Sequence, residues 1–402
     1  MPRTRDGQLM TEFLHDDTWD FNGVDTQYAT HGLHTYLAAM IPQLAHRLIE
    51  MYVPPRASIL DPFCGGGAVL VESLLNGRHA TGRDINDLAV LISKAKTTHV
   101  PQAQIADTRA VVLEQALHYR GEPLSFAPTD HVDYWFKPEA MPPLTALRRA
   151  IDEIADDQLN TLFSAIFSAT VRDVSLTYRN EIRLRRMTEE ELGRFNPNVF
   201  ERFDNRARVA ELQVGHLPQE ARADVGRADA RAMEFADDQF TAIVCSPPYG
   251  DERNGVPYIQ FSRNMLMWLG FTRDEVMEAK ADTLGWAKKD NEEPPSNTLS
   301  AALAAIEHNP TAYREALAFY DDYHRALKEM VRVTAERIVI VIGQRVLSGT
   351  IFDNASITVD LMVQLGASLE ARHRRKLPTK RLPKMREFGA AIDTEHILVF
   401  RK

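Results

Sequence analysis

A short apolar run that leads into three consecutive glycines constrains the fold of this 402-residue chain more than any other feature. Residues 59–61 are Ile-Leu-Asp, and residues 62–67 are Pro-Phe-Cys-Gly-Gly-Gly. Residues 68–76 then favour a helix, which Gly77 is suited to end, and residues 79–83 favour a second strand. A strand, a glycine loop, a helix and a strand in this order predict one βαβ unit of a parallel sheet.

Two acids mark the strand ends of this unit. The first strand is predicted at residues 58–60 with Asp61 at its carboxyl end, and Asp84 follows the second strand 23 residues later. Parallel sheets bind ligands at the carboxyl ends of their strands, and an acid at this offset can accept hydrogen bonds from ribose hydroxyls. The loop has neither the G-x-G-x-x-G dinucleotide pattern nor the lysine of a phosphate-binding loop. The pattern therefore indicates a nucleoside with a cationic or zwitterionic tail; the alternative is a glycine-rich turn in which Asp61 only caps the helix.

A second motif lies where another apolar strand, residues 241–245, runs into the tetrad Ser246-Pro247-Pro248-Tyr249. The prolines lack a backbone N–H and stiffen the turn. The Ser246 hydroxyl and the Pro247 carbonyl can therefore each accept one N–H of an exocyclic amine, which directs its lone pair toward an incoming methyl group. Tyr249 offers a flat face on which a base can stack. The alternative is an ordinary turn that ends a strand.

The two motifs together resemble those of the amino methyltransferases of DNA in restriction–modification systems. A tetrad that begins with serine resembles the N4-cytosine group, because N6-adenine enzymes more often begin it with Asp or Asn. The resemblance extends to residues 28–36 with Ile41-Pro42, to residues 227–230 and to residues 377–381, and it covers roughly half of the chain. It implies an α/β fold, namely a Rossmann-like sheet with helices on both faces.

The resemblance also implies which residues hold the base and which hold the cofactor, S-adenosyl-L-methionine. The implied catalytic residues are Ser246, Pro247, Pro248 and Tyr249. The implied cofactor-binding residues are His31, Asp61, Pro62, Phe63, Cys64, Gly65, Gly67, Asp84, Ile85, Asp229 and Ala230.

Apolar spacing together with the resemblance divides the chain into four parts: a polar lead-in at 1–27, a cofactor-binding part at 28–100, a largely helical insertion at 101–225 and a catalytic part at 226–402. The insertion replaces a connection that is short in many relatives, and it is the candidate for target recognition. We also predict a helix over residues 36–52 and a loop or disordered segment over residues 287–299.

Local charge, rather than the net charge of −9, favours a DNA partner. Residues 371–386 hold eight Lys or Arg and no acid, and residues 172–186 hold five Arg and two acids. The candidates for DNA contacts are Arg183, Arg185, Arg374, Arg375, Lys376, Lys380 and Arg381. The alternatives are a solvated basic loop and, for the second group, ion pairs with residues 189–191. The expected partner is double-stranded DNA with its target base flipped out, because a stacked base cannot reach the tetrad.

Composition excludes several other classes of protein. The two cysteines, Cys64 and Cys245, lie inside the motifs, so neither a disulfide framework nor a zinc site is expected, and a reducing cytoplasm fits. Cys245 precedes the prolines, and a small buried residue explains it better than a nucleophile does. No stretch of about 18 apolar residues and no signal peptide is present, so we expect no membrane association.

Three other functions stay open from the sequence. They are N6-adenine methylation of DNA, guanine-N2 methylation of RNA by a related Pro-Pro-Tyr enzyme, and DNA binding by a catalytically inactive methyltransferase fold. A cognate restriction endonuclease is a candidate partner. The recognition sequence and the oligomeric state do not follow from these patterns.

Overall fold

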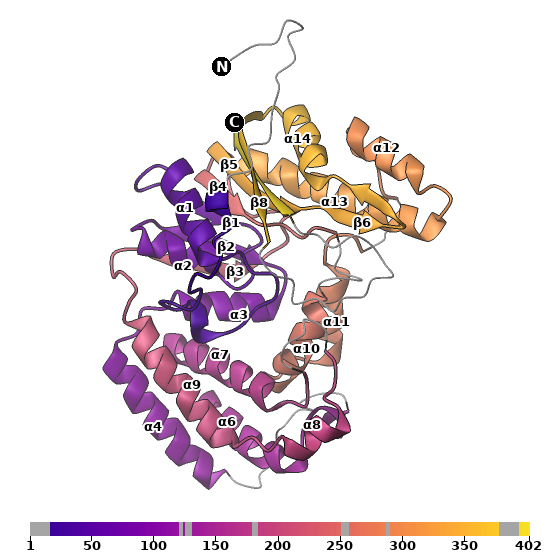
Figure 1. Ribbon diagram of the computed structural model, residues 1–402. Coiled ribbons are helices and arrows are strands. Elements are labelled where there is room, and N and C mark those ends of the chain that lie inside the picture. Colours follow the sequence, from indigo (N-terminus) through magenta and orange to yellow (C-terminus); the bar gives the residue numbers. More distant parts are fainter. Residues whose placement is uncertain are drawn as a thin grey trace, which may run out of the picture.

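A computed structural model describes residues 17–119, 124, 131–178, 184–250, 257–286, 290–377 and 394–402. Its centre is a seven-stranded sheet in the order β3-β2-β1-β4-β5-β9-β8 (Figure 1). The strands are β1 (Ile59–Asp61), β2 (Ala80–Asp84), β3 (Ala223–Arg227), β4 (Phe240–Cys245), β5 (Thr334–Gly343), β8 (Ser368–Lys376) and β9 (Thr394–Arg401). A separate hairpin consists of β6 (Arg345–Leu347) and β7 (Thr350–Phe352).

Strands β3, β2, β1, β4 and β5 are parallel, whereas β9 is antiparallel to both β5 and β8. The central strands are apolar on both faces, as buried parallel strands usually are. On β5, for example, Val339 and Val341 belong to one core cluster, and Ile338 and Ile340 belong to another. Both faces of the sheet are therefore covered.

Helices cover the two faces of the sheet in separate groups (Figure 1). Helix α1 packs on one face and shares a core with Val69 of α2, while α12, α13 and α14 pack on the other. The bounds of these helices are α1 (Pro42–Tyr52), α2 (Ala68–Leu75), α12 (Asn297–Ala305), α13 (Pro310–Val333) and α14 (Asn354–Gln364). The doubly covered, mostly parallel sheet confirms the predicted fold class.

Most of the remaining helices form a block at one end of the sheet (Figure 1). It contains α4 (Gln102–His118), α5 (Val132–Trp135), α6 (Met141–Asp152), α7 (Asp157–Val174), α8 (Glu189–Arg194) and α9 (Val199–Val214). One continuous core joins this block to α3 (Asp87–Lys96), α10 (Tyr258–Trp268) and α11 (Arg273–Ala281). The block is thus packed against α3, which itself contacts β3, rather than attached by a linker. Short 3₁₀ turns occur at Asp17–Trp19, His31–Leu33 and Pro138–Ala140.

The order of the strands contains a switch point at β1. The chain runs from β1 to β2 and β3 and then returns to β4 on the opposite side of β1. Open α/β sheets bind ligands outside the carboxyl ends of the strands at such a point. Asp61 ends β1 and Ser246 follows β4, so the fold places the two predicted motifs side by side.

Two predicted elements need correction. The helix predicted for residues 36–52 begins only at Pro42, because proline suits the first helical turn and the preceding Ile41 is extended, with ψ at 139°. The predicted loop at 287–299 ends in the first turn of α12, where the Ser296 hydroxyl accepts a hydrogen bond from the Leu299 N–H. No helix in the described part of the chain combines the length and the apolar character needed to cross a membrane.

Candidate active site

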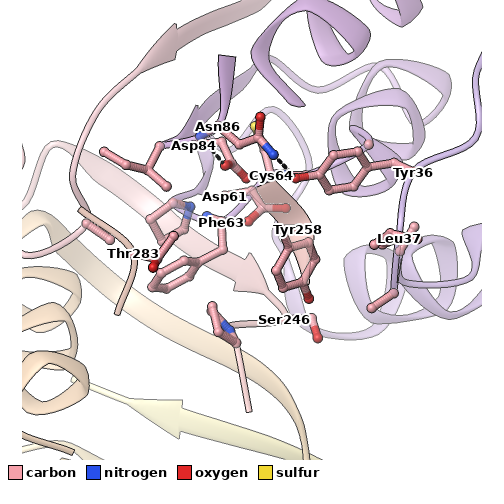
Figure 2. Close-up of a pocket in the computed structure, with 18 of the residues that line it drawn as sticks. Tyr36, Leu37, Asp61, Phe63, Cys64, Asp84, Asn86, Ser246, Tyr258 and Thr283 are labelled. Atoms are coloured by element: carbon pink, nitrogen blue, oxygen red, sulfur yellow. Dashed lines mark hydrogen bonds between the residues drawn. The ribbon is translucent and has the colours of Figure 1, made fainter. Parts of the chain in front are cut away.

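A pocket opens at the switch point between β1 and β4 (Figure 2). Its walls come from segments that are far apart in the sequence but meet at the carboxyl ends of the strands. They are residues 36–40, 61–66, 68–69, 84–86, 228–230, Ser246, Pro248, residues 258–259 and residues 282–284. The pocket therefore brings together most of the residues predicted for the cofactor and half of the predicted catalytic tetrad.

The glycine loop closes tightly around the strand ends. Gly65 has a φ of +47°, and its N–H donates to Asp84 Oδ2 over 2.9 Å. A Cβ atom at Gly66 would lie 2.9 Å from Cβ of Tyr36. The loop needs glycine at these positions because one adopts a left-handed conformation and the other lies directly under an aromatic residue.

Asp61 is the most buried acid in this pocket. Its carboxyl is 3% exposed, and Oδ1 accepts a hydrogen bond from the Phe63 N–H over 3.0 Å. Burial raises the pKa of Asp61 to about 8; the bond from Phe63 opposes this rise, and the Asp84 carboxylate adds to it. Asp61 is directed into the pocket (Figure 2), so a cation bound there would relieve the cost of its buried charge.

Asp84 has a more polar environment. Its two carboxylate oxygens accept from the N–H groups of Gly65 and Asn86, each over 2.9 Å. Burial raises the pKa of Asp84 to about 6, and these backbone hydrogen bonds limit the rise. Asp84 therefore shapes the glycine loop in addition to lining the pocket.

Ser246 lines the pocket directly after β4. Its hydroxyl lies 3.3 Å from the Tyr249 hydroxyl, which donates to Glu395 Oε1 on β9 over 3.0 Å. The Tyr249 carbonyl accepts from Asn354 Nδ2 over 3.0 Å. These bonds hold the turn at both its side chains and its backbone. Pro247 is buried, and neither Pro247 nor Tyr249 is among the described residues that line the pocket.

Comparison with known proteins agrees with this geometry. A DNA methylase family model matches residues 10–95. The type II methyltransferase M.MvaI of Kocuria varians is 33% identical over 401 aligned residues, which cover 90% of this chain and 87% of that protein. The chain belongs to the N6/N4 family of DNA methyltransferases.

Other similar proteins match this chain over a shorter stretch or at lower sequence identity. M.MjaII, a type II methyltransferase of Methanocaldococcus jannaschii, is 35% identical over 66 residues, which cover 16% of this chain and 12% of that protein. A SAM-dependent methyltransferase of Methanosarcina mazei has a TM-score of 0.33 and 10% identity, with 88% of this chain and 96% of that chain covered. The rRNA methyltransferase aviRa of Streptomyces viridochromogenes has a TM-score of 0.32 and 10% identity, with 92% of this chain and 88% of that chain covered.

The methyl donor of this methyltransferase is S-adenosylmethionine, and the chemistry of the pocket fits it. The described lining includes four acids, Asp61, Asp84, Asp229 and Asp282, and none of the described lining residues is Lys or Arg. This balance suits a cofactor with a sulfonium and an ammonium group, and it disfavours a ligand with a phosphate chain. The glycine loop allows close approach of backbone to the ligand.

Two aromatic residues of the pocket were not predicted as site residues. The rings of Tyr36 and Tyr258 stack with their centroids 6.0 Å apart, and the Tyr36 hydroxyl accepts from Asn86 Nδ2 over 3.0 Å. Asn86, considered from the sequence alone, resembles an ordinary turn residue, but it also caps α3 and donates to Ser262 Oγ over 2.8 Å. In the sequence, Tyr36 is singled out only by its position in segment 28–36, which resembles the family. No sequence pattern singles out Tyr258.

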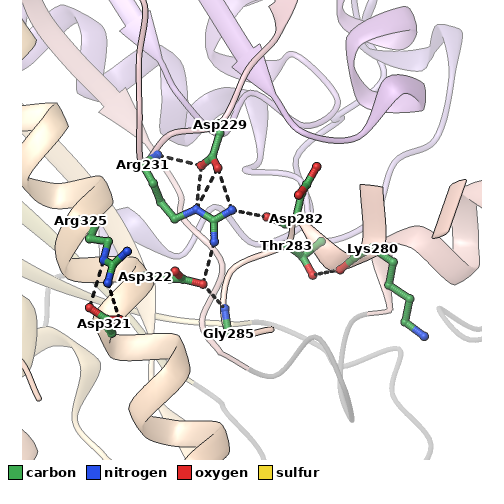
Figure 3. Close-up of polar contacts among 9 residues, drawn as sticks. All are labelled: Asp229, Arg231, Lys280, Asp282, Thr283, Gly285, Asp321, Asp322 and Arg325. Carbon is green, nitrogen blue, oxygen red and sulfur yellow. Dashed lines mark hydrogen bonds and ion pairs between the residues drawn. The ribbon is translucent and has the colours of Figure 1, made fainter. Parts of the chain in front are cut away.

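A cluster of ion pairs holds the part of the pocket wall that residues 228–230 and 282–284 form (Figure 3). Arg231 is 9% exposed in its side chain and binds the Asp229 carboxylate, Asp322 Oδ2 on α13 and the Asp282 carbonyl, over 2.7 to 2.9 Å. Asp322 also accepts from the Gly285 N–H over 3.1 Å. The predicted Asp229 thus lines the pocket, but Arg231 already occupies much of its carboxylate.

Two residues predicted to bind the cofactor lie outside the pocket. His31 is buried, and its Nε2 lies 2.8 Å from Oε1 of the fully buried Glu72, which also accepts from the Tyr28 hydroxyl over 2.6 Å. Gly67 begins α2 with a φ of +77°, and a Cβ atom there would lie 2.8 Å from Ser93 Oγ. His31 therefore pairs with Glu72 rather than lining this pocket, and Gly67 lets the loop before α2 approach Ser93 of α3 closely.

The predicted basic segment 371–386 is partly a strand. Residues 368–376 form β8, and strand pairing places Arg375 opposite Glu395. Arg375 is 3% exposed, and its Nη1 lies 3.5 Å from Glu395 Oε2, so the prediction that Arg375 contacts DNA is wrong. The neighbouring Arg374 and Lys376 are exposed, as alternation along a strand requires.

Other predicted DNA contacts have mixed outcomes. Arg185 lies over the ring of Tyr178, with Cζ 4.2 Å from the ring centroid. Arg183, Lys380 and Arg381 lie outside the described residues.

Cys245, as expected, is fully buried, and burial raises the pKa of its thiol well above the ordinary value, which disfavours a nucleophilic thiolate. The described part of the chain contains no cluster of three or more side chains suited to bind a metal.

Proposed function

We propose that this enzyme transfers a methyl group to the exocyclic N4 of cytosine in double-stranded DNA. The observation that carries the proposal is the position of Ser246, which follows β4 and lines the acidic pocket formed around Asp61. Serine at the start of the tetrad favours cytosine over adenine. The name of the relative M.MvaI, a type II methyltransferase, supports action at a specific site and a cognate restriction endonuclease as partner. Two free, buried cysteines and a DNA substrate support a location in the cytoplasm.

The proposed chemistry uses acceptors that the turn holds in place. S-adenosylmethionine supplies an already activated methyl group, so no covalent nucleophile is needed. The Ser246 hydroxyl and the Pro247 carbonyl each accept one N–H of the flipped cytosine, which orients the lone pair of N4 toward the cofactor. Tyr249 presents its ring to the base while Glu395 fixes its hydroxyl.

We assign the cofactor contacts to the residues that line the pocket. Asp61 faces the cationic tail, and Asp84 accepts from the ribose hydroxyls. Tyr36 and Tyr258 provide apolar walls. The remaining contacts come from Pro62, Phe63, Cys64, Gly65, Ile85, Asp229 and Ala230.

The base specificity has a direct test. Duplex DNA is incubated with enzyme and cofactor, hydrolysed to nucleosides and analysed by mass spectrometry. N4-methylcytosine is the expected product. If N6-methyladenine is found instead, adenine is the target base. A methylated guanosine found only with RNA would overturn the proposal of a DNA substrate.

Cofactor binding should release a proton near neutral pH. Asp61, with a pKa of about 8, is mostly protonated at pH 7 in the free enzyme, whereas a bound cation favours its carboxylate. Affinity should therefore rise with pH, by at most about tenfold per pH unit, and level off above about pH 8. Calorimetric titration in buffers of different ionisation enthalpy measures the proton directly. The Asp61→Asn variant should release none, and equal proton release by both proteins would contradict the assignment.

A further inference from the structure

A chain of four polar side chains runs from the last two strands of the sheet to the catalytic serine. It starts at Arg375 on β8, passes through Glu395 on β9 and the Tyr249 hydroxyl, and ends at Ser246. The successive contacts measure 3.5, 3.0 and 3.3 Å. Methyl transfer as proposed above uses the serine hydroxyl and the tyrosine ring, so the tyrosine hydroxyl and the two strand residues have no part in it yet.

The charged members of this chain are shielded from water and held by strand pairing. The side chain of Arg375 is 3% exposed and that of Glu395 is 16% exposed. The two residues lie opposite each other on β8 and β9, and Glu395 also lies opposite Gly343 at the carboxyl end of β5. The carboxylate is therefore fixed at the end of the sheet where the catalytic turn begins.

The hydrogen atoms of this chain can point in one direction only. A carboxylate can only accept, so Tyr249 uses its one hydroxyl hydrogen for Glu395 Oε1. Burial and the nearby Glu395 carboxylate raise the pKa of Tyr249 well above its ordinary value, so the hydroxyl keeps this hydrogen. At the contact with Ser246, the tyrosine oxygen can then only accept, and the serine hydroxyl must donate.

The direction of these bonds decides what Ser246 offers to a base. Among the described residues, Tyr249 is the only hydrogen-bond partner of Ser246 Oγ. The single hydrogen of the serine is thus committed to Tyr249, and its lone pairs are left for the substrate. An exocyclic amine brings N–H donors to these lone pairs, whereas a carbonyl oxygen at the same position brings another acceptor and is repelled. A serine free to turn its hydrogen toward an amine would leave an N–H unpaired.

We propose that Glu395 is a positioning residue that sets the hydrogen-bond polarity of Ser246, so that the site accepts an exocyclic amine and rejects a carbonyl oxygen. Glu395 acts through the Tyr249 hydroxyl and does not touch the base, and Arg375 supplies its counter-charge. The inference rests on the proposed role of Ser246 as an acceptor, and it holds for a cytosine and for an adenine target alike.

Two conservative variants interrupt the chain at different points. In Glu395→Gln, the amide oxygen should turn toward the Arg375 guanidinium, which leaves the NH₂ group to donate to Tyr249 and so reverses the polarity. Tyr249→Phe keeps the ring for the base and removes the hydroxyl. Each variant should lower kcat about tenfold with little change in KM for DNA or in cofactor affinity. Transfer of a radioactive methyl group to DNA measures the rate whichever base receives it.

The double variant separates a positioning role from a merely structural one. If Glu395 acts only through the Tyr249 hydroxyl, the two losses do not add, and the double variant should be about tenfold slower than wild type rather than about a hundredfold. Additive losses would overturn the proposal. If Glu395→Gln fails to fold, a wild-type rate in Tyr249→Phe overturns it alone.

A binding measurement tests the discrimination between amine and carbonyl directly. The target position is mapped from the methylated product, and its base is replaced by the deaminated counterpart, uracil for cytosine or hypoxanthine for adenine. In either variant, the ratio of the Kd for this duplex to the Kd for the normal duplex should fall about three- to tenfold below the wild-type ratio. Comparing ratios between proteins cancels the easier opening of the altered base pair. An unchanged ratio would contradict the proposed polarity.

The matched control is Glu370→Gln at the other end of the same strands. Glu370 on β8 binds Arg337 on β5 through two contacts of 3.0 and 3.1 Å, and Arg337 lies opposite Arg401 rather than Glu395. This variant removes another carboxylate that pairs with an arginine of the sheet, and it should leave kcat and the Kd ratio unchanged.

The outcome is distinguishable from a failure of the proposed function. Full activity of Ser246→Ala would remove the serine acceptor and with it the proposed function. Wild-type kcat and Kd ratios in Glu395→Gln and Tyr249→Phe, together with a slow Ser246→Ala, would overturn only the role of Glu395.

Discussion

Ser246→Ala should slow methyl transfer about a hundredfold while cofactor affinity stays nearly unchanged. The serine hydroxyl is one of only two acceptors proposed for the target amine. Its loss leaves one N–H of the amine unpaired and the lone pair poorly oriented at the moment of transfer. Single-turnover methylation of a duplex with saturating enzyme measures the chemical step, and calorimetric titration measures the cofactor.

A matched control exists at the other end of the same strands. The Ser58 hydroxyl accepts from the Thr241 N–H over 3.1 Å, before β1 and β4 reach the pocket. Ser58→Ala removes the same atom from the same pair of strands and should leave the rate of transfer unaffected. Full activity of Ser246→Ala would rule out a serine-based mechanism, whichever base is methylated.

Asp61→Asn should weaken S-adenosylmethionine binding by roughly thirtyfold or more, since truncating one partner of a buried charge pair costs about 2–5 kcal/mol. Asparagine keeps the shape and can still accept from the Phe63 N–H, so the loss reports the charge. The effect should be largest above pH 8, where wild-type Asp61 is ionised before the cofactor arrives. Calorimetric titration across this range measures it.

The stability of the cofactor-free variant provides the control. A folded-state pKa of about 8 means that ionising Asp61 destabilises the free protein as pH rises from its ordinary value toward 8. Asp61→Asn should therefore keep or raise Tm at alkaline pH. Asp107→Ala, on the exposed face of α4, should change neither binding nor Tm. Wild-type affinity in Asp61→Asn would remove Asp61 from the cofactor site.

The sequence predicts the parts of the site that depend on local chain order. Asp61 and Ser246 each follow an apolar strand, and the carboxyl ends of parallel strands must meet at one edge of the sheet. The fold class follows from the same pattern, with strand ends displaced by only one residue at β1 and β2. These features need no knowledge of distant contacts.

The sequence could not place side chains whose partners lie far away along the chain. The position of His31 depends on Glu72, a fully buried acid that a helical pattern alone does not distinguish from a solvated one. The burial of Arg375 depends on the register that places it opposite Glu395. Residues of α10, α11, α13 and β6 line a second cavity, and no run of residues in the sequence signals that these elements meet.

The position of β9 in the sheet bears on when, during synthesis, the catalytic turn becomes fixed. The strand occurs near the end of the chain, yet it pairs between β5 and β8, and its Glu395 fixes the hydroxyl of Tyr249 from more than a hundred residues away. During synthesis, a ribosome-bound chain has both the cofactor pocket and the tetrad before it has the residue that steadies the catalytic turn. A chain cut short before β9 would lack both the strand that joins β5 to β8 and the acid that fixes the turn. The catalytic turn therefore depends on a residue that is synthesised long after the turn itself.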